Sequence, residues 1–230
     1  MNKTGIEWCT YTWNPAVGCT RGCPWCYARR FARRSPCAEC RAFIPHFHPE
    51  RLDQPARVKK SAIIFVGSMG EMFDPVLSYG VRDAIGDAMG RANQHEYIIL
   101  TKRPERIDMR LKDNLTLGVS VTNQADADER IPALLNNWHG RTVVSYEPAL
   151  GLVDFGLPWG RSIDWLIIGA MTGPKAVTPE REWIETAVEQ ARESHVPVFV
   201  KDNVVKQYPE FAGIREWPEA FAGHSHAREG

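Results

Sequence analysis

The sequence predicts an α/β protein whose parallel strands form a partial, open TIM barrel of the (β/α)6 type. Short runs rich in β-branched residues alternate with helical patterns, which indicates right-handed crossovers and a parallel sheet. Several of these runs are apolar at every position, as strands buried on both faces are. Seven strands are one fewer than a complete eightfold barrel has, and 230 residues are few for one, so an open barrel fits best.

The predicted helices lie between strands, at residues 79–92, 126–136 and 179–193. The last helix has Thr178 as its N-cap and Pro179 at its first position, and its apolar residues fall on one stripe, as in a helix that covers a sheet. The strands are expected around residues 6–12 and at residues 62–66, 97–100, 115–121, 142–145, 165–168 and 196–200.

One large domain is expected at residues 1–212, with an insertion at residues 35–60 and a polar tail at residues 213–230. The tail is weakly patterned, so we expect it to fray unless Trp217 anchors its first part. Its two histidines, His224 and His226, have no supporting ligand residues near them in the sequence.

The composition is that of an ordinary soluble protein, with 43% hydrophobic residues. No apolar run reaches the length of a membrane span, and the N-terminus lacks the apolar core of a signal peptide. We therefore expect a monomer in the cytoplasm that makes no contact with a membrane. In that compartment, six cysteines indicate metal or cluster ligands rather than disulfide bonds.

The net charge is zero, but the charges are unevenly distributed. Residues 1–60 contain eleven Lys or Arg and four Asp or Glu, which gives this segment a charge of +7 and the remainder −7. A basic segment attracts polyanions such as nucleic acids; the alternative is a solvated helix face beside a negatively charged cluster. The basic residues are concentrated at Arg29, Arg30, Arg33, Arg34, Arg41, Arg57, Lys59 and Lys60.

Cys19, Cys23 and Cys26 form the most informative motif, C-x-x-x-C-x-x-C. Three thiolates at this spacing hold three irons of a cubic iron–sulfur cluster, and the fourth iron stays open because no fourth cysteine is close in the sequence. An open iron suits chelation by the amino and carboxylate groups of S-adenosylmethionine. The alternative is a structural zinc site that another cysteine or a histidine completes.

Polar and glycine-rich groups follow the predicted strands at their carboxyl ends, where parallel α/β folds gather functional groups. We expect them to converge on one rim, although each alone has a turn or a cap as its simpler explanation. The charged candidates for substrate contact, each of which could instead be an ion pair in the barrel mouth, are Lys102, Arg103, Glu147, Lys201 and Asp202.

The cysteine motif, with the aromatic Trp25 before its last cysteine, resembles the signature of the radical S-adenosylmethionine superfamily. Residues 67–71, Gly-Ser-Met-Gly-Glu, resemble the glycine-rich turn that holds the methionine amino group in that superfamily. From about residue 6 to residue 217, the chain is similar to a phage-associated branch found in phages and bacteria. The segments that carry this similarity are residues 13–15, 47–52, 65–71, 100–104, 118–121 and 147–148.

The resemblance implies a [4Fe-4S] cluster that receives one electron from an external flavodoxin- or ferredoxin-like protein. The electron breaks the carbon–sulfur bond of S-adenosylmethionine, and the resulting 5′-deoxyadenosyl radical takes a hydrogen atom from a substrate. The sequence departs from the superfamily pattern at residues 67–71, which are not a plain Gly-Gly-Glu, and at Thr122, where an acidic residue is expected. The implied cofactor-binding residues are Trp25, Tyr27, Gly67, Ser68, Met69, Gly70, Glu71, Ser120 and Thr122.

Cys37 and Cys40 form a second pair, followed by His46 and His48. Four interpretations are open: a zinc clip, ligands of an auxiliary cluster, a redox-active dithiol, or two reduced thiols. Because the histidines are spaced more closely than in common zinc fingers, we favour inert or weakly metal-binding thiols. Cys9 is expected to be a small core residue.

The leading hypothesis is a radical enzyme whose substrate is a nucleic-acid base or nucleotide, as in modification or repair of phage DNA. Enzymes that act on a base in duplex DNA usually extrude it into a pocket, and the lack of a separate DNA-binding module in the sequence counts against intact duplex. A peptide or a small metabolite is an alternative substrate. The alternative functions are a zinc-stabilised nucleic-acid-binding module and an iron–sulfur electron-transfer protein that does not cleave S-adenosylmethionine.

Overall fold

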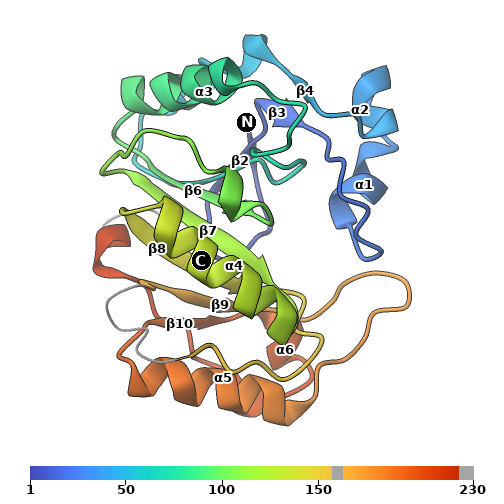
Figure 1. The fold of residues 1–230 in the computed structure, drawn as a ribbon, viewed down its shortest axis with the longest axis vertical. Coiled ribbons are helices and arrows are strands. Elements are labelled where there is room, and N and C mark those ends of the chain that lie inside the picture. Colours follow the sequence, from blue (N-terminus) through green and yellow to red (C-terminus); the bar gives the residue numbers. More distant parts are fainter. Residues whose placement is uncertain (157–162, 223–230) are drawn as a thin grey trace.

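The computed structural model describes residues 1–156 and 163–222, and its centre is an eight-stranded sheet (Figure 1). The strands are ordered β1-β2-β5-β6-β7-β8-β9-β10, and every neighbouring pair except β1 with β2 is parallel. The two edge strands, β1 and β10, do not pair with each other, so the sheet is not a closed barrel. The strands are β1 (Asn2–Lys3), β2 (Tyr11–Trp13), β5 (Ile63–Val66), β6 (Glu96–Thr101), β7 (Leu115–Val121), β8 (Arg141–Tyr146), β9 (Leu166–Ile168) and β10 (Val198–Val200).

The mixed α/β class and the predominantly parallel sheet agree with the sequence-based prediction. The first predicted strand, at residues 6–12, is wrong in its first half. Residues 6–9 form a turn in which the Cys9 amide donates to the Ile6 carbonyl, so pairing with β5 begins only with β2. Cys9 is fully buried, as expected for a core residue.

Three helices cover one face of the sheet: α3 (Tyr79–Arg91), α4 (Gln124–Asn137) and α5 (Arg181–Glu193) (Figure 1). Each buries an apolar stripe in the larger core cluster, for example Ile85, Leu134 and Ile184. Their contribution to the core explains why the strand residues facing them are almost completely excluded from water.

The predicted start of α5 is wrong. The helix begins at Arg181, with Glu180 in an extended conformation as its N-cap, rather than at Pro179 with Thr178 as the cap. Pro179 is buried, and its carbonyl accepts a hydrogen bond of 2.8 Å from the Tyr208 hydroxyl. The Pro179 carbonyl is thus bonded to a tertiary partner, two residues before the helix begins.

The opposite face of the sheet carries a smaller, aromatic core cluster that includes Trp8, Phe65, Trp165 and Phe199. Residues from β5 and β10, near the two ends of the strand order, meet in this cluster, so the sheet curves around it.

The first part of the predicted polar tail packs into the same cluster. Phe221 is 1% exposed, and Trp217 packs at its edge. The Trp165 indole donates to the Glu216 carbonyl at 3.0 Å. The packed part of the chain therefore extends beyond residue 212, and the remaining tail, with His224 and His226, lies outside the described residues.

The segment between β2 and β5 forms a separate layer at the edge of the sheet. It contains β3 (Ala16–Val17), α1 (Tyr27–Ala32), α2 (Ala38–Ala42) and β4 (His46–Phe47), and β3 pairs antiparallel with β4 (Figure 1). The predicted insertion, residues 35–60, is thus the second half of a longer excursion from the sheet.

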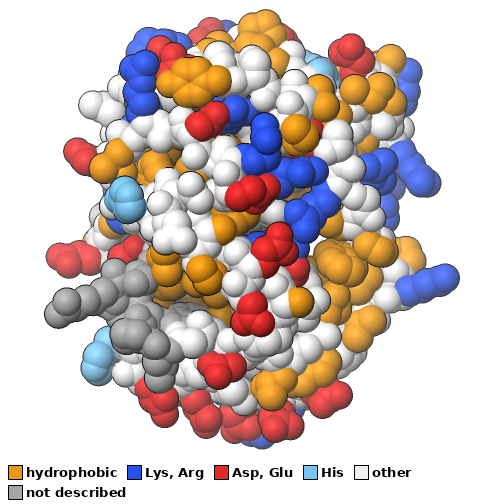
Figure 2. All heavy atoms as spheres, in the orientation of Figure 1, with side chains coloured by type: hydrophobic (Ala, Val, Ile, Leu, Met, Phe, Trp, Pro, Cys, Tyr) orange, Lys and Arg blue, Asp and Glu red, His pale blue; other side chains and the backbone are white. Residues whose placement is uncertain are grey.

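The charge asymmetry persists in the folded molecule. Figure 2 shows red acidic side chains gathered at the end formed by α5, and most of the blue Lys and Arg side chains away from that end. Among the helices in the described ranges, none combines the length and apolar character that crossing a membrane requires.

Candidate functional site

A cavity of about 640 Å³ lies at the carboxyl ends of the parallel strands. Its volume is within the range of small-molecule and cofactor sites. The cavity brings together most of the residues that the sequence singled out, although they come from separate strands and loops. The predicted residues in its lining are Cys19, Cys23, Trp25, Cys26, Tyr27, Gly67, Ser68, Met69, Gly70, Glu71, Lys102, Ser120, Glu147 and Lys201.

Three of the candidates for cofactor or substrate contact are not in the cavity lining. Thr122 is buried and directly precedes Asn123, the N-cap residue of α4, and its amide and hydroxyl donate to Asp126 Oδ2 at 3.0 and 2.6 Å. Arg103 donates from Nη2 to Thr20 Oγ1 at 3.0 Å. Asp202 forms an ion pair with Arg215. The structure therefore gives each of them a partner within the protein.

The three cysteines of the motif carry free thiols on one loop beside the cavity. Cys26 caps α1 and accepts a hydrogen bond of 3.3 Å from the Arg29 amide, and Cys19 accepts one of 3.2 Å from the Arg21 amide. Such N–H···S contacts tune the sulfur ligands of iron–sulfur clusters. The loop therefore already contains hydrogen bonds that suit thiolate ligands.

Burial raises the pKa of the Cys19 thiol to about 11, against the opposing effect of the Arg21 amide. The carboxylates of Glu71 and Asp74 raise this pKa further. Without a metal, Cys19 thus stays protonated at neutral pH, and a metal that binds there must displace the proton.

Asp74 anchors the cysteine loop to the segment after β5. It is fully buried, and its Oδ2 accepts hydrogen bonds of 2.8 Å from both the amide and the hydroxyl of Thr20. Its Oδ1 accepts from the Val76 amide at 3.1 Å. The sequence reasoning missed Asp74, because a single aspartate in a loop has no pattern that would distinguish a buried anchor from a surface residue.

Asn14 is a second anchor, at the end of β2. Its Oδ1 accepts from the Met69 amide at 2.8 Å, and its Nδ2 donates to the Ser68 hydroxyl at 3.1 Å. Tyr27 adds a further link, since its hydroxyl donates to the Ser68 carbonyl at 2.7 Å. These contacts hold residues 67–71 against the cysteine loop.

Gly18 and Gly70 permit this close approach. The two backbones form an isolated parallel bridge, and a Cβ atom on Gly70 would lie 2.8 Å from the Gly18 carbonyl oxygen. Gly18 has a φ of +93°, and a Cβ atom there would lie 2.3 Å from the Ile44 carbonyl oxygen. No other residue type fits these two positions without a shift of the backbone.

Glu71 connects the ends of β5 and β6 at the wall of the cavity. Its Oε1 accepts from the Thr101 hydroxyl at 2.6 Å, and its Oε2 accepts from the Lys102 amide at 3.0 Å. Its Oε1 also accepts from the Phe73 amide at 3.2 Å. A carboxylate accepts about four hydrogen bonds, so Glu71 keeps the capacity for about one more from a ligand. Farther along the strand order, Glu147 and Lys201 form an ion pair in the cavity lining. This agrees with the alternative in which these residues pair with each other in the barrel mouth.

The donor set of the cavity fits a cluster with one open iron. Three thiols line the cavity, whereas Cys9, Cys37 and Cys40, the remaining cysteines, are absent from its lining in the described part of the chain. Three sulfur ligands beside a cavity leave a coordination position for a ligand that is not protein.

Cys37 and Cys40 lie apart from this cavity, together with His46 and His48. One ligand atom from each of the four side chains lies within 4.8 Å of the others. The close spacing of the histidines, which counted against a metal site in the sequence, does not prevent this convergence. Residues i and i+2 of an extended segment point to the same side, and β4 contains His46 and ends just before His48.

No curated protein and no solved structure matches the chain. Residues 3–215, which include every strand of the sheet except the first residue of β1, match a family described as "Protein of unknown function (DUF5131)". On this match, which covers nearly the whole chain, the protein belongs to the DUF5131 family.

Proposed function

We propose that the protein is a radical S-adenosylmethionine enzyme built on a partial (β/α) barrel. The observation that carries the proposal is the position of Cys19, Cys23 and Cys26. All three line one cavity at the carboxyl ends of the strands, with no further cysteine in its lining among the described residues. A structural metal site is closed by its protein ligands, whereas these thiols adjoin open space.

A [4Fe-4S] cluster on these cysteines would supply one electron to S-adenosylmethionine, which divides into methionine and a 5′-deoxyadenosyl radical that takes a hydrogen atom from the substrate. The chain provides the binding groups around it. Glu71 offers carboxylate acceptors for an ammonium group, on the wall next to the cysteines. Trp25 and Tyr27 contribute aromatic surface that limits the access of water.

The proposed substrate is a nucleic-acid base or a nucleotide. The cavity lining contains Arg21 and Lys102, and α1 next to it carries Arg29 and Arg30, whereas the charge of Lys201 is paired with Glu147. Arg30 reaches across to the Thr172 carbonyl, in the cavity lining after β9, at 3.4 Å. Positive groups at the mouth of a cavity favour an anionic substrate.

The direct test is anaerobic reconstitution with iron and sulfide, followed by reduction with dithionite in the presence of S-adenosylmethionine. We expect a brown protein that forms 5′-deoxyadenosine and methionine, with no product from the Cys23→Ala variant. A flavodoxin- or ferredoxin-like protein should replace dithionite. Addition of nucleotides or single-stranded DNA should increase product formation if the substrate class is right.

Two other functions give different outcomes in the same assay. An iron–sulfur electron-transfer protein would be brown but would form no 5′-deoxyadenosine. A zinc-stabilised nucleic-acid-binding module, which the convergence of Cys37, Cys40, His46 and His48 favours, would be colourless and would bind nucleic acid in a salt-sensitive manner.

A further inference from the structure

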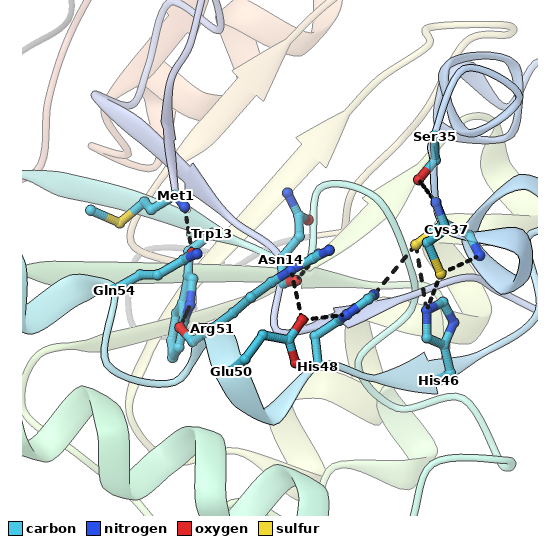
Figure 3. Close-up of polar contacts among 11 residues, drawn as sticks. Met1, Trp13, Asn14, Ser35, Cys37, His46, His48, Glu50, Arg51 and Gln54 are labelled. Atoms are coloured by element: carbon cyan, nitrogen blue, oxygen red, sulfur yellow. Dashed lines mark hydrogen bonds and ion pairs between the residues drawn. The ribbon is translucent and has the colours of Figure 1, made fainter.

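The side chains of Cys37, Cys40, His46 and His48 have the separations of ligands around one metal ion. Figure 3 shows three of them, Cys37, His46 and His48, close together. His46 Nε2 lies 3.7 Å from Cys37 Sγ and 3.4 Å from Cys40 Sγ, and His48 Nε2 lies 3.3 Å from Cys40 Sγ. In a tetrahedral zinc site, bonds of about 2.3 Å to sulfur and about 2.0 Å to nitrogen separate the two ligand atoms by about 3.5 Å. The observed distances are close to this value.

Both imidazoles are oriented by an acceptor behind them. His46 Nδ1 lies 2.7 Å from the Ile44 carbonyl oxygen. His48 Nδ1 lies 2.8 Å from Glu50 Oε1 (Figure 3). In each histidine, the proton on Nδ1 is donated to its acceptor, and the lone pair of Nε2 is then directed at the thiols. Histidines that bind metals almost always have such an outer partner, which fixes the tautomer and the ring orientation.

Contacts with the backbone also help to orient the two cysteine ligands. Cys37 caps α2, and its Sγ accepts from the Cys40 amide at 3.5 Å. Phe43, in the left-handed conformation with a φ of 59°, ends α2 and turns the chain toward β4. A helical turn thus supplies the cysteines, and the adjoining extended segment supplies the histidines on one side.

We propose that Cys37, Cys40, His46 and His48 bind one Zn²⁺ ion in a closed, structural site. Two thiolates and two imidazoles in a tetrahedral arrangement are typical zinc ligands, and the two thiolates neutralise the charge of the ion. The short separations exclude a [4Fe-4S] cluster at this place, because each thiolate of such a cluster binds a different iron. Cys40 is 4% exposed, and among the described residues none of the four ligands lines the 640 Å³ cavity of the cysteine motif, although Cys40 adjoins a neighbouring cavity of about 560 Å³.

The proposed zinc ion would stabilise the segment that supports the loop of Cys19, Cys23 and Cys26. His46 pairs with Val17 in the β3–β4 ribbon, two residues before Cys19. The Cys19 amide donates to the Phe43 carbonyl at 3.3 Å, and the buried Phe43 ring packs in a cluster against which Cys19 and Cys26 lie. The zinc ligands are therefore adjacent to the residues that contact the loop of Cys19, Cys23 and Cys26.

The test is metal analysis of the full-length protein, purified from cells supplied with iron and zinc. We expect about one zinc per chain, independent of iron content. The variants Cys40→Ser and His48→Gln should lose this zinc. The zinc should be retained by Cys23→Ala, in the motif of Cys19, Cys23 and Cys26, and by His139→Gln, at an exposed site. Removal of zinc should also accelerate hydrogen exchange of amides in residues 37–48.

A measurement on the wild-type protein covers the case in which the variants do not fold. After a chelator removes zinc, Co²⁺ should restore one equivalent of metal with the intense visible absorption of a tetrahedral cobalt–thiolate site. Weak octahedral bands, a wild-type protein that binds no zinc after reconstitution, or zinc that disappears with Cys23→Ala would each overturn the proposal. Iron lost from Cys40→Ser in place of zinc would also overturn it. None of these readouts depends on cleavage of S-adenosylmethionine, so this proposal and the proposed function fail separately.

Discussion

The two cysteine clusters differ in the number of their ligands and in what they face. Cys19, Cys23 and Cys26 line part of a 640 Å³ cavity, and all three are thiols, with no histidine beside them in the lining among the described residues. Cys37 and Cys40 converge with two histidines, and the ligand atoms of all four lie within 4.8 Å of one another. An incomplete ligand set next to open space suits chemistry, whereas a complete and compact set suits stability. Under the two proposals, the same residue type would serve two purposes a few residues apart.

The two clusters meet at several backbone contacts, which include the hydrogen bond from the Cys19 amide to the Phe43 carbonyl and the pairing of Val17 with His46. Gly18, directly before the triad, approaches the carbonyl of Ile44, which lies between the cysteines and histidines of the second cluster. A change at this junction should affect both clusters, whereas a change within one cluster should leave the metal of the other in place.

The largest expected effect is that of Cys23→Ala. Because Cys23 makes no hydrogen bond that the structure shows through its sulfur, the substitution removes a ligand and little else. We expect iron content after reconstitution to fall at least about tenfold, with zinc unchanged. Iron and zinc contents of purified protein measure this, and Cys9→Ala, in the core but outside both clusters, is the control that should keep both metals.

Gly18→Ala should be strongly destabilising, by about 2–4 kcal/mol, since the Cβ atom would overlap the Ile44 carbonyl and the φ of +93° is strained for alanine. Denaturant unfolding of the metal-free protein gives the free energy. The matched control is Gly22→Ala in the same loop, where nothing lies within 4 Å of the added atom. Equal stabilities of the two variants would show that the junction is not close-packed.

Asp74→Asn should cost about 1–3 kcal/mol, because an amide in place of the carboxylate cannot accept all three hydrogen bonds from Thr20 and Val76. The triad loop should loosen and bind iron more weakly, while zinc stays bound. Unfolding and iron content report the two effects. Asp53→Asn, at an exposed ion pair with Arg57, should leave both unchanged.

The smallest expected effect concerns the ion pair between Glu147 and Lys201 in the cavity lining. Glu147→Gln leaves the lysine without its partner and should lower stability by about 1 kcal/mol. Addition of Lys201→Met should recover part of the loss, and a double-mutant cycle measures the coupling. Additive losses would mean that the two charges act independently, as substrate contacts would.

The strands of the sheet and the helices that cover it could be predicted from the sequence, because the pattern of apolar residues directly reflects which positions are buried. The fully buried strand β7, for example, coincides with the predicted residues 115–121. The cavity residues were accessible for a related reason, since the carboxyl ends of parallel strands meet at one edge.

Features that depend on tertiary contacts could not be predicted from the sequence. Thr122 resembles a cofactor contact in the sequence, yet Asp126 engages it as part of the cap of α4. The anchor Asp74 has no local signature in the sequence, and Pro179, predicted as the first residue of α5, lies before the helix with its carbonyl bonded to Tyr208. The convergence of the second cluster depends on the strand at residues 46–47, which is too short to recognise by periodicity.

The most direct test of the open cluster is electron paramagnetic resonance of the reconstituted, dithionite-reduced protein with and without S-adenosylmethionine. We predict the signal of a reduced [4Fe-4S] cluster whose g-values shift when S-adenosylmethionine is added, in the wild type and in Cys40→Ser if that variant folds, but no such signal in Cys23→Ala. A protein that gives no cluster signal, or a signal that S-adenosylmethionine leaves unchanged, would contradict the assignment of Cys19, Cys23 and Cys26 as the open site.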